Sequence, residues 1–279
     1  ALPLPAMARR TDPEPHQDAP PWSVLDELTD WRDEIHASAI FLTRLPIRWQ
    51  GDMPPDLAAR SLRAGPIVGG AIGLAGGAVF AGALALGMPP TLAALFAIAA
   101  QIGLTGGLHE DGLADLADGL GGGRDRAAKL EIMRDSRIGS YGALALILAV
   151  GARVLALASL EPLAGIAALV AAGAMSRAVW PALMNWLPPA RTDGVAAAHG
   201  EQPAIRLAVT LGLAAALAFL VLPFFTALAA LAAAVLATAG TGLLAWRQIG
   251  GHTGDVLGGA QQIVEIAMLA ALAALAAPV

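Results

Sequence analysis

Acidic side chains gather in one polar stretch of the chain, residues 105–142, between two apolar segments. Asp111, Asp115 and Asp118 are spaced i, i+4 and i+7, so on a helix their carboxylates share one face. Like charges at this spacing repel one another, and a divalent cation would remove that penalty. Mg²⁺ favours oxygen ligands and binds through a few carboxylates, substrate phosphates and water. The spacing therefore predicts a magnesium site, with His109 just before it as a further candidate catalytic residue.

Basic side chains follow the acids within the same stretch and can supply cations for phosphate oxygens: Arg124, Arg126, Lys129, Arg134 and Arg137. Glycines at 106–107 and 121–123 bracket the acidic helix and permit close approach of the backbone to a ligand. Acids for a metal beside bases for phosphates are the parts of a phosphoryl-transfer site. The alternative is a solvated hairpin held by ion pairs, which needs neither the three-carboxylate face nor the glycines.

Two further sets of residues are candidates for the same site. A glycine-rich turn at 250–255 leads into the last apolar segment, which we expect to pack beside the helix of 109–120. We expect Thr253 and Asp255 to bind substrate or metal there, the alternative for Asp255 being a helix cap. Arg177 lies inside an apolar segment, where a charge usually faces the bundle interior, and we expect it to reach a phosphate. Arg153, nearer the other end of its segment, is expected only to snorkel.

The composition shows what kind of protein carries these residues. Of the 279 residues, 57% are hydrophobic and 14% charged, against about 45–50% and 25% in soluble domains. This excludes a soluble enzyme and a disordered protein, and the net charge of −5 offers no basic patch for nucleic acid. The absence of cysteine excludes disulfides and thiolate chemistry. We therefore expect an all-α, polytopic membrane helix bundle.

Hydropathy predicts about seven spans, each needing roughly 20 apolar residues. They cover residues 66–88, 91–108, 141–160, 163–186, 205–223, 226–245 and 258–277. Before them, apolar residues recur every three or four positions from Trp22 to Leu42, with acids between them. This pattern predicts an amphipathic helix at the membrane interface, the alternative being a helix packed on another cytosolic segment. We expect residues 1–21 to form a disordered tail and residues 22–279 a single membrane domain.

The distribution of Lys and Arg predicts the orientation in the membrane. Apart from Arg153 and Arg177 inside spans and Arg206 at a span boundary, these residues lie before the first span and in the polar segments 109–140, 187–204 and 246–257. The short turns between the other span ends have none. By the positive-inside rule, all the polar segments face the cytoplasm. The protein is therefore expected in the bacterial cytoplasmic (inner) membrane, in contact with lipid.

The residues of these motifs resemble the signature of the cobalamin synthase family. The resemblance rests on TGGLH at 105–109, DGLAD at 111–115, DG at 118–119, IMRDSRIG at 132–139 and GHTGD at 251–255. FLTRLP at 41–46, Ser176-Arg177 and Ala190-Arg191 stand in the expected order, so nearly all of the chain after residue 35 is covered. Glu110 departs from the pattern, which more often has an apolar residue at that position.

The resemblance implies a Mg²⁺-dependent transferase, adenosylcobinamide-GDP ribazoletransferase. Such an enzyme joins adenosylcobinamide-GDP to α-ribazole or its 5′-phosphate, giving adenosylcobalamin or its 5′-phosphate and releasing GMP. In that reaction Arg134 and Arg137 would hold phosphates, and Asp135 or Asp118 would accept the proton of the attacking ribose hydroxyl. Association with other enzymes of cobalamin assembly is a further expectation.

Two other functions remain as alternatives. A membrane phosphotransferase acting on CDP-linked alcohols partly matches residues 111–114, but Asp115 stands where that pattern has Arg. An ion-coupled transporter would use the acids and Arg177 along an ion path. Transporter sites usually lie near the membrane midplane, whereas these acids cluster in one polar segment and the spans hold almost no carboxylates.

The predicted topology can be tested in this cysteine-free chain. Because residues 109–140 and 246–257 are expected in the cytoplasm, Lys129→Cys and Gln248→Cys should each resist an impermeant thiol reagent in intact cells. Both should react after lysis. Labelling of either cysteine in unbroken cells would contradict the arrangement.

Overall fold

The computed structural model describes residues 24–191 and 202–276, which form helices without any named strand. The predicted disordered tail, residues 1–21, and residues 192–201 of the polar segment 187–204 lie outside this part of the chain. The long apolar helices match the predicted spans to within a few residues. They are α3 (Gly65–Ala85), α4 (Pro90–Thr105), α7 (Ser140–Ala158), α8 (Pro162–Trp186), α10 (Ala204–Val221), α11 (Phe224–Ile249) and α12 (Gly254–Ala276).

The remaining helices lie before α3 and within the polar stretch. They are α1 (Val24–Leu42), α2 (Leu57–Arg60), the 3₁₀ helix η1 (Ser61–Ala64), α5 (Leu108–Gly122) and α6 (Arg126–Ile132). Within the described residues, six helices are long and apolar enough to cross a membrane. The α4–α5 pair passes the same test only together, with a bend of 92°, which would make a seventh span. The expected multi-pass helix bundle is therefore confirmed, but α4, predicted as a span at 91–108, is too short to count alone and would cross only together with α5.

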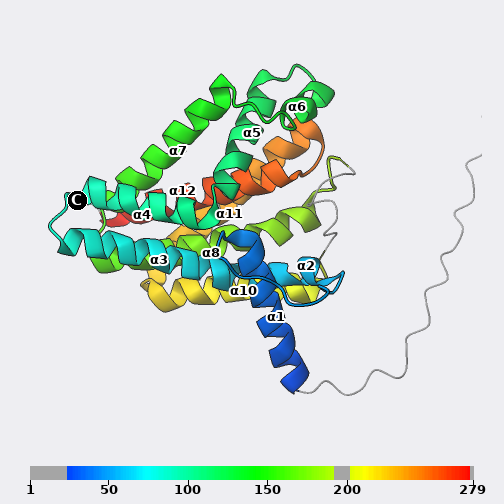
Figure 1. The fold of residues 1–279 in the computed structure, drawn as a ribbon. Helices are drawn as coiled ribbons and strands as arrows, with labels where there is room; N and C mark the ends of the chain where they lie inside the picture. Colours follow the sequence, from blue (N-terminus) through cyan, green and yellow to red (C-terminus); the bar gives the residue numbers. More distant parts are fainter. Residues whose placement is uncertain (1–23, 192–201, 277–279) are drawn as a thin grey trace, which may run out of the picture.

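The described helices are joined so that their polar connections lie at one end of the bundle. Short turns link α3 to α4, α7 to α8 and α10 to α11. In Figure 1 the turn between α3 and α4 lies at the left, whereas α6, the end of α8 and the turn from α11 to α12 lie towards the right. We call this second region the polar end.

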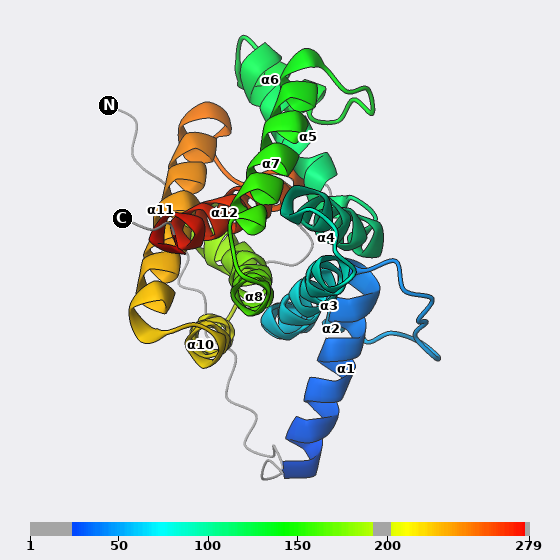
Figure 2. The same cartoon turned by 90° about the vertical axis from the view of Figure 1, so that its left-hand side faces the viewer.

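Glycines bring α3 and α8 into backbone contact. Gly65, Gly69, Gly73 and Gly77 recur every fourth residue, so they share one face of α3. A Cβ on Gly69 would lie 2.1 Å from the carbonyl oxygen of Gly173 on α8. Small residues allow such close packing of membrane helices. Figure 2 shows α3 and α8 side by side.

Two glycines make the bend between α4 and α5. Gly106 and Gly107 have φ values of +68° and +70°, which only glycine adopts without strain. The amide of Gly107 donates to the carbonyl of Ile102 at 3.0 Å and closes the end of α4. Farther along, a Cβ on Gly121 would lie 2.6 Å from the ring of Tyr141. Chain geometry and helix packing therefore account for these glycines, which we had expected to approach a ligand.

A buried carboxylate fastens α1 to the bundle. Glu34 is fully buried and accepts hydrogen bonds from Arg63, from Arg60 at 3.3 Å and from Arg206 of α10 at 3.0 Å. A carboxylate without solvent needs such partners. The second half of α1 is therefore packed on neighbouring segments, the alternative that the sequence left open. Its place at a membrane interface stays a prediction.

The contact between α3 and α8 predicts how substitutions in α3 will act. Gly69→Val should lower the free energy of unfolding by about 3 kcal/mol, because the new side chain must enter a backbone contact. Gly82→Val, on the same helix, has open space around it and is the matched control. Thermal unfolding in detergent measures both, and equal melting temperatures would contradict the packing.

Candidate active site

The backbones of α5 and α12 touch at the polar end. A Cβ on Gly112 of α5 would lie 3.1 Å from the Cα of Gly258 and 3.4 Å from the Cα of Asp255. Asp111 and Asp115 flank Gly112 on α5. The crossing therefore brings the acidic part of α5 beside the start of α12, and confirms that residues 251–255 pack on the helix of 109–120.

The carboxylates of the two helices act on one another electrostatically. Burial, together with the negative charges of Asp111, Asp255 and Asp118, raises the pKa of Asp115 to about 6, against the opposing effect of Arg191. Like charges held close together make each ionised form less favourable. A cation bound between α5 and α12 would relieve this repulsion.

Asp255 has its own partners at the start of α12. Arg191 Nη2 lies 3.3 Å from Asp255 Oδ2, and the hydroxyl of Thr253 donates to the same oxygen at 3.1 Å. The Thr253 hydroxyl also accepts the amide hydrogen of Val256 at 3.2 Å. The helix cap is therefore Thr253, and the carboxylate of Asp255 faces Arg191 instead of capping α12. Arg191 is part of a motif that matches the family pattern, but no role was predicted for it from the sequence.

Backbone pairing and one arginine hold the segment that carries Arg191. The amide of His252 donates to the carbonyl of Pro188 at 2.9 Å, and the amide of Ala190 donates to the carbonyl of His252 at 2.8 Å. Arg126 donates to the carbonyls of Ile249 and Ala190 at 2.7 and 2.6 Å. Arg126, grouped above with the phosphate-binding cations, thus caps the end of α11 and fixes this segment.

Asp118 is held differently from Asp111 and Asp115. It is buried, and its two oxygens accept the amide hydrogens of Gly139 and Gly142 at 2.7 and 2.8 Å, at the start of α7. Within the described part of the chain, no three acidic, histidine or cysteine side chains are grouped so that they could hold a metal ion. No preformed three-ligand cage is present there, and Mg²⁺ on this face stays a prediction.

The other predicted residues of the polar stretch lie outside this cluster of contacts. Asp135 pairs with Arg137 at 2.5 Å on the surface, and this guanidinium lowers the pKa of Asp135 to about 2. A carboxylate with so low a pKa is a weak proton acceptor. Arg124 and Arg134 are exposed on either side of α6.

Four charged side chains meet inside the bundle: Glu110 of α5, Arg153 of α7, Arg177 of α8 and Glu265 of α12. Arg153 Nη2 donates to Glu110 Oε1 at 2.9 Å, and Arg153 Nη1 lies 3.5 Å from Glu265 Oε1. Arg177 Nη1 donates to Glu265 Oε2 at 3.1 Å. We call these four residues the buried charge network.

The network corrects one expectation and adds to two others. Arg153 is only 1% exposed and ion-paired, so the expectation that it snorkels was wrong. Arg177 is paired with Glu265 in the interior, and its contact with a phosphate stays a prediction. Glu265 is the one carboxylate in the predicted spans. Gln261, Gln262 and Glu265 in one apolar segment were the available signal, because polar groups at membrane depth are costly.

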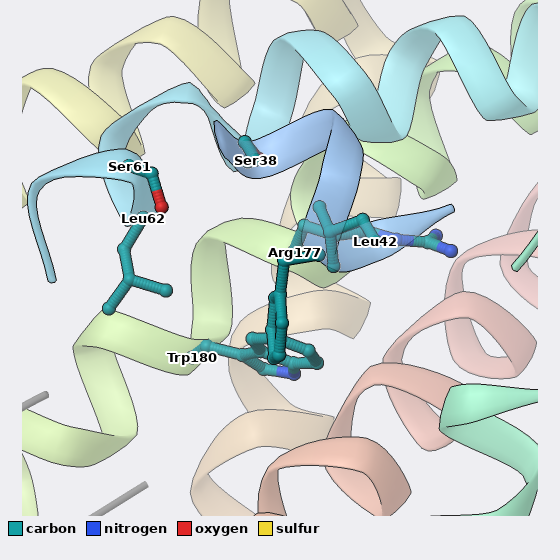
Figure 3. A pocket seen from close by; sticks show the side chains of 8 residues that line it. Ser38, Leu42, Ser61, Leu62, Arg177 and Trp180 are labelled. Atoms are coloured by element: carbon teal, nitrogen blue, oxygen red, sulfur yellow. The ribbon is translucent and has the colours of Figure 1, made fainter. Parts of the chain in front are cut away.

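His109 lies in the interior beside this network. It is fully buried, and its ring centroid is 5.4 Å from that of Trp180, whose indole donates to the carbonyl of Leu257 at 2.7 Å. Neither ring nitrogen has a hydrogen-bond partner among the described residues. Trp180 and Arg177 also line a narrow cavity between α8, η1 and α1, with Ser38 and Ser61 on its other sides (Figure 3). His109 is therefore enclosed in the interior of the bundle, and its catalytic role stays a prediction.

Comparison with known proteins decides the family. A family profile described as Cobalamin-5-phosphate synthase matches residues 34–273. The chain belongs to this family. An adenosylcobinamide-GDP ribazoletransferase of Azorhizobium caulinodans is 46% identical over 248 residues, which cover 85% of this chain and 93% of the relative. The transferase of the same name from Sinorhizobium medicae is 44% identical, covering 89% and 99%. No solved structure matches significantly.

The family assignment confirms the resemblance and settles the class of protein. A member of the cobalamin-5-phosphate synthase family is a transferase of cobalamin biosynthesis, and the apolar helices make this one a multi-pass membrane protein. The assignment agrees with neither the CDP-alcohol phosphotransferase nor the transporter that the sequence left as alternatives. The matched range, residues 34–273, spans the positions of Glu34 and of the buried charge network.

Removing one member of the network should be costly for stability. Glu265→Ala leaves Arg177 and Arg153 without their shared carboxylate, and breaking a buried pair in this way costs about 3–5 kcal/mol. Glu161→Ala, an exposed acid in the turn before α8, is the control and should melt like the unaltered protein. A Glu265→Ala variant with an unchanged unfolding temperature would contradict the ion pairing.

Proposed function

We propose that the chain is an adenosylcobinamide-GDP ribazoletransferase whose active site lies between α5 and α12. It joins adenosylcobinamide-GDP to α-ribazole, or to its 5′-phosphate, and releases GMP. The observation that carries this proposal is the crossing at Gly112 and Gly258, which brings Asp111 and Asp115 beside Asp255. The names of the relatives support the choice of substrates.

The reaction exchanges one phosphorus–oxygen bond for another. A ribose hydroxyl attacks the cobinamide-side phosphorus of the pyrophosphate, the bond from that phosphorus to GMP breaks, and the hydroxyl proton passes to a carboxylate. Catalysis of such a transfer depends on positioning and on neutralising the charge of the phosphates. The site must therefore supply a cation, donors for phosphate oxygens and a proton acceptor.

Asp111 and Asp115 are the residues that would hold Mg²⁺. The absence of a third converging ligand in the described residues is compatible with this ion, which binds through one or two carboxylates together with substrate phosphates and water. The mutual repulsion of the two carboxylates, spaced i and i+4, also favours a bound cation. When bound, Mg²⁺ would neutralise charge on the pyrophosphate.

Arg191 and Asp255 complete the proposed site. Arg191 Nη1 is buried and has no hydrogen-bond partner among the described residues, whereas Nη2 contacts Asp255. A guanidinium with one donor available suits a phosphate oxygen. We assign to Asp255 the role of accepting the proton of the attacking hydroxyl. Asp118 already binds backbone amides, and Asp135 is paired with Arg137.

The remaining expectations belong to the same proposal. The polar end would face the cytoplasm of a bacterium, where nucleotide-linked substrates are made, and the spans would lie in the inner membrane. Arg124, Arg134 and Arg137, exposed near the polar end, would attract the phosphates of incoming substrates. Association with other enzymes of cobalamin assembly stays a prediction.

Asp115→Asn tests the proposed metal site. Loss of the carboxylate should cut GMP release at least about a hundredfold, which equals roughly 2.7 kcal/mol in the barrier. The unfolding temperature should stay the same or rise, because a repulsive charge is removed. Purified protein would be assayed with both substrates and Mg²⁺, with the exposed Asp52→Asn as control. Near-normal turnover of Asp115→Asn would refute the assignment.

Asp255→Asn and Thr253→Ala separate catalysis from helix capping. Thr253→Ala removes the cap and should lower stability by about 0.5–2 kcal/mol. Asp255→Asn should instead reduce GMP release at least about a hundredfold while the protein stays folded. Melting temperature and turnover are measured for both variants. If Asp255→Asn melts lower but turns over normally, Asp255 has only a structural role.

A further inference from the structure

The buried charge network lies where ionic groups are most costly. Glu110, Arg153, Arg177 and Glu265 are each no more than 9% exposed. Removing charges from water carries a large penalty, and well-packed apolar residues often stabilise a protein as well or better. Stability is therefore a weak explanation for the network, whereas fixing one helix arrangement is an attested use of buried polar groups.

The network ties α5 to two other helices through one residue. Glu110 directly precedes Asp111 on α5, and its Oε1 accepts hydrogen bonds from Arg153 of α7 at 2.9 Å and from Gln262 of α12 at 3.1 Å. Because hydrogen bonds are directional, these two bonds fix the orientation of the Glu110 side chain. Because residues of one helix rotate together, they also fix the direction of Asp111 and Asp115.

The crossing of α5 with α12 does not by itself fix that rotation. Gly112 and Gly258 meet without side chains, so their contact sets the distance between the two helices. Small residues permit close approach but offer no interlocking knob. A rotation of α5 about its own axis would turn Asp111 and Asp115 away from Asp255.

Two sets of hydrogen bonds oppose this rotation. Asp118 accepts the amide hydrogens of Gly139 and Gly142 towards the end of α5. Glu110 binds Arg153 and Gln262 at the start of α5, directly beside Asp111.

We propose that Glu110 and Arg153 are positioning residues, which hold the rotation of α5 so that Asp111 and Asp115 face Asp255. The inference rests on the proposed function of these carboxylates. It assigns a role to Glu110, the position at which this chain departs from the usual family pattern. It also pairs that acid with an arginine of α7, whose described contacts are with Glu110 and Glu265.

The pair can be removed without leaving a buried charge alone. In a Glu110→Leu/Arg153→Leu variant, Glu265 keeps Arg177 at 3.1 Å and Gln261 at 2.6 Å. Gln262 keeps its bond to the Gln261 side chain at 2.8 Å. The double variant is therefore expected to fold, whereas each single leucine variant leaves one charge without its closest partner.

A disulfide can report the position of α5 independently of activity. A Cβ on Gly259 of α12 would lie 3.5 Å from the Cβ of Leu116 on α5, within the spacing that disulfides require. The chain has no cysteine of its own. In Leu116→Cys/Gly259→Cys, the shorter side chain at 116 also removes the clash that Leu116 would make with a new Cβ at 259.

The experiment measures cross-linking and GMP release in parallel. Cross-linking uses the proteins with the two added cysteines, and GMP release uses the same proteins without them. With Glu110 and Arg153 present, mild oxidation should form the disulfide rapidly. In the Glu110→Leu/Arg153→Leu background, cross-linking should slow at least about fivefold because the two Cβ atoms no longer stay at bonding distance. GMP release should fall by about tenfold to a hundredfold at an unchanged melting temperature. Removing the exposed ion pair by Arg32→Leu/Asp33→Leu is the matched control and should alter neither readout.

The outcomes separate this proposal from the proposed function. Wild-type cross-linking in the leucine background overturns the positioning role, and slowed cross-linking with normal GMP release overturns its importance for catalysis. If the unaltered protein releases no GMP, the proposed function fails, while cross-linking still decides whether Glu110 and Arg153 position α5. Glu110→Met/Arg153→Met, which also removes both hydrogen-bonding partners but with unbranched, adaptable side chains, is the second variant if the leucine variant does not fold. Wild-type values for it in both readouts overturn the proposal.

Discussion

The contact between the backbones of α5 and α12 is the constraint on which the polar end of this protein depends. Two glycines, Gly112 and Gly258, allow it, since a Cβ at either position would already lie within 3.2 Å of the other helix, and a larger side chain would hold the helices apart. The contact brings acids from distant parts of the sequence together at one place. The sharp turn at Gly106 and Gly107 directs α5 across the bundle towards α12, so the conformational freedom of these glycines is used to build the site.

The two glycine-based contacts of the bundle differ in what they must achieve. The contact of α3 with α8 joins two apolar helices, and close packing is sufficient there. The contact of α5 with α12 has to hold charged groups in a defined direction. Ion pairs and amide side chains surround it from α7, α8 and α12, and each charge of the buried charge network has a partner of opposite sign. The need to pair buried charges thus links the interior of the bundle to the carboxylates at its surface.

The sequence predicted the parts of this structure that depend on local composition. The apolar helices begin and end close to the predicted positions because span length and hydropathy are properties of a single segment. The packing of residues 251–255 on α5 was also predicted, from the alternation of spans. The role of Thr253 as the cap of α12 was not, since Asp255 is an equally suitable capping residue by type.

The errors have a common physical cause, which is that a partner in another helix decides what a charged residue does. Arg153 looks like a snorkelling residue until Glu110 and Glu265 are placed beside it. For Asp118 a metal contact stays a prediction, and the spacing did not show that the amides of Gly139 and Gly142 bind its oxygens. The polar cluster of Glu265 and its neighbouring glutamines was missed because hydropathy averaged over the whole of α12 is strongly apolar. The backbone pairing of Pro188 with His252 brings Arg191 beside Asp255, and the sequence does not reveal this pairing.

The central claim is that the close approach of α5 and α12 forms the catalytic site. The most direct measurement is the rate of GMP release by a Gly112→Val variant, compared with Gly103→Val, whose position on α4 has open space around it. Both proteins would be purified in detergent and shown to be folded before assay. The account predicts that Gly112→Val loses at least about a hundredfold in turnover because the carboxylates of α5 are pushed away from Asp255, whereas Gly103→Val keeps it. Turnover by folded Gly112→Val at the rate of the unaltered protein would contradict the account.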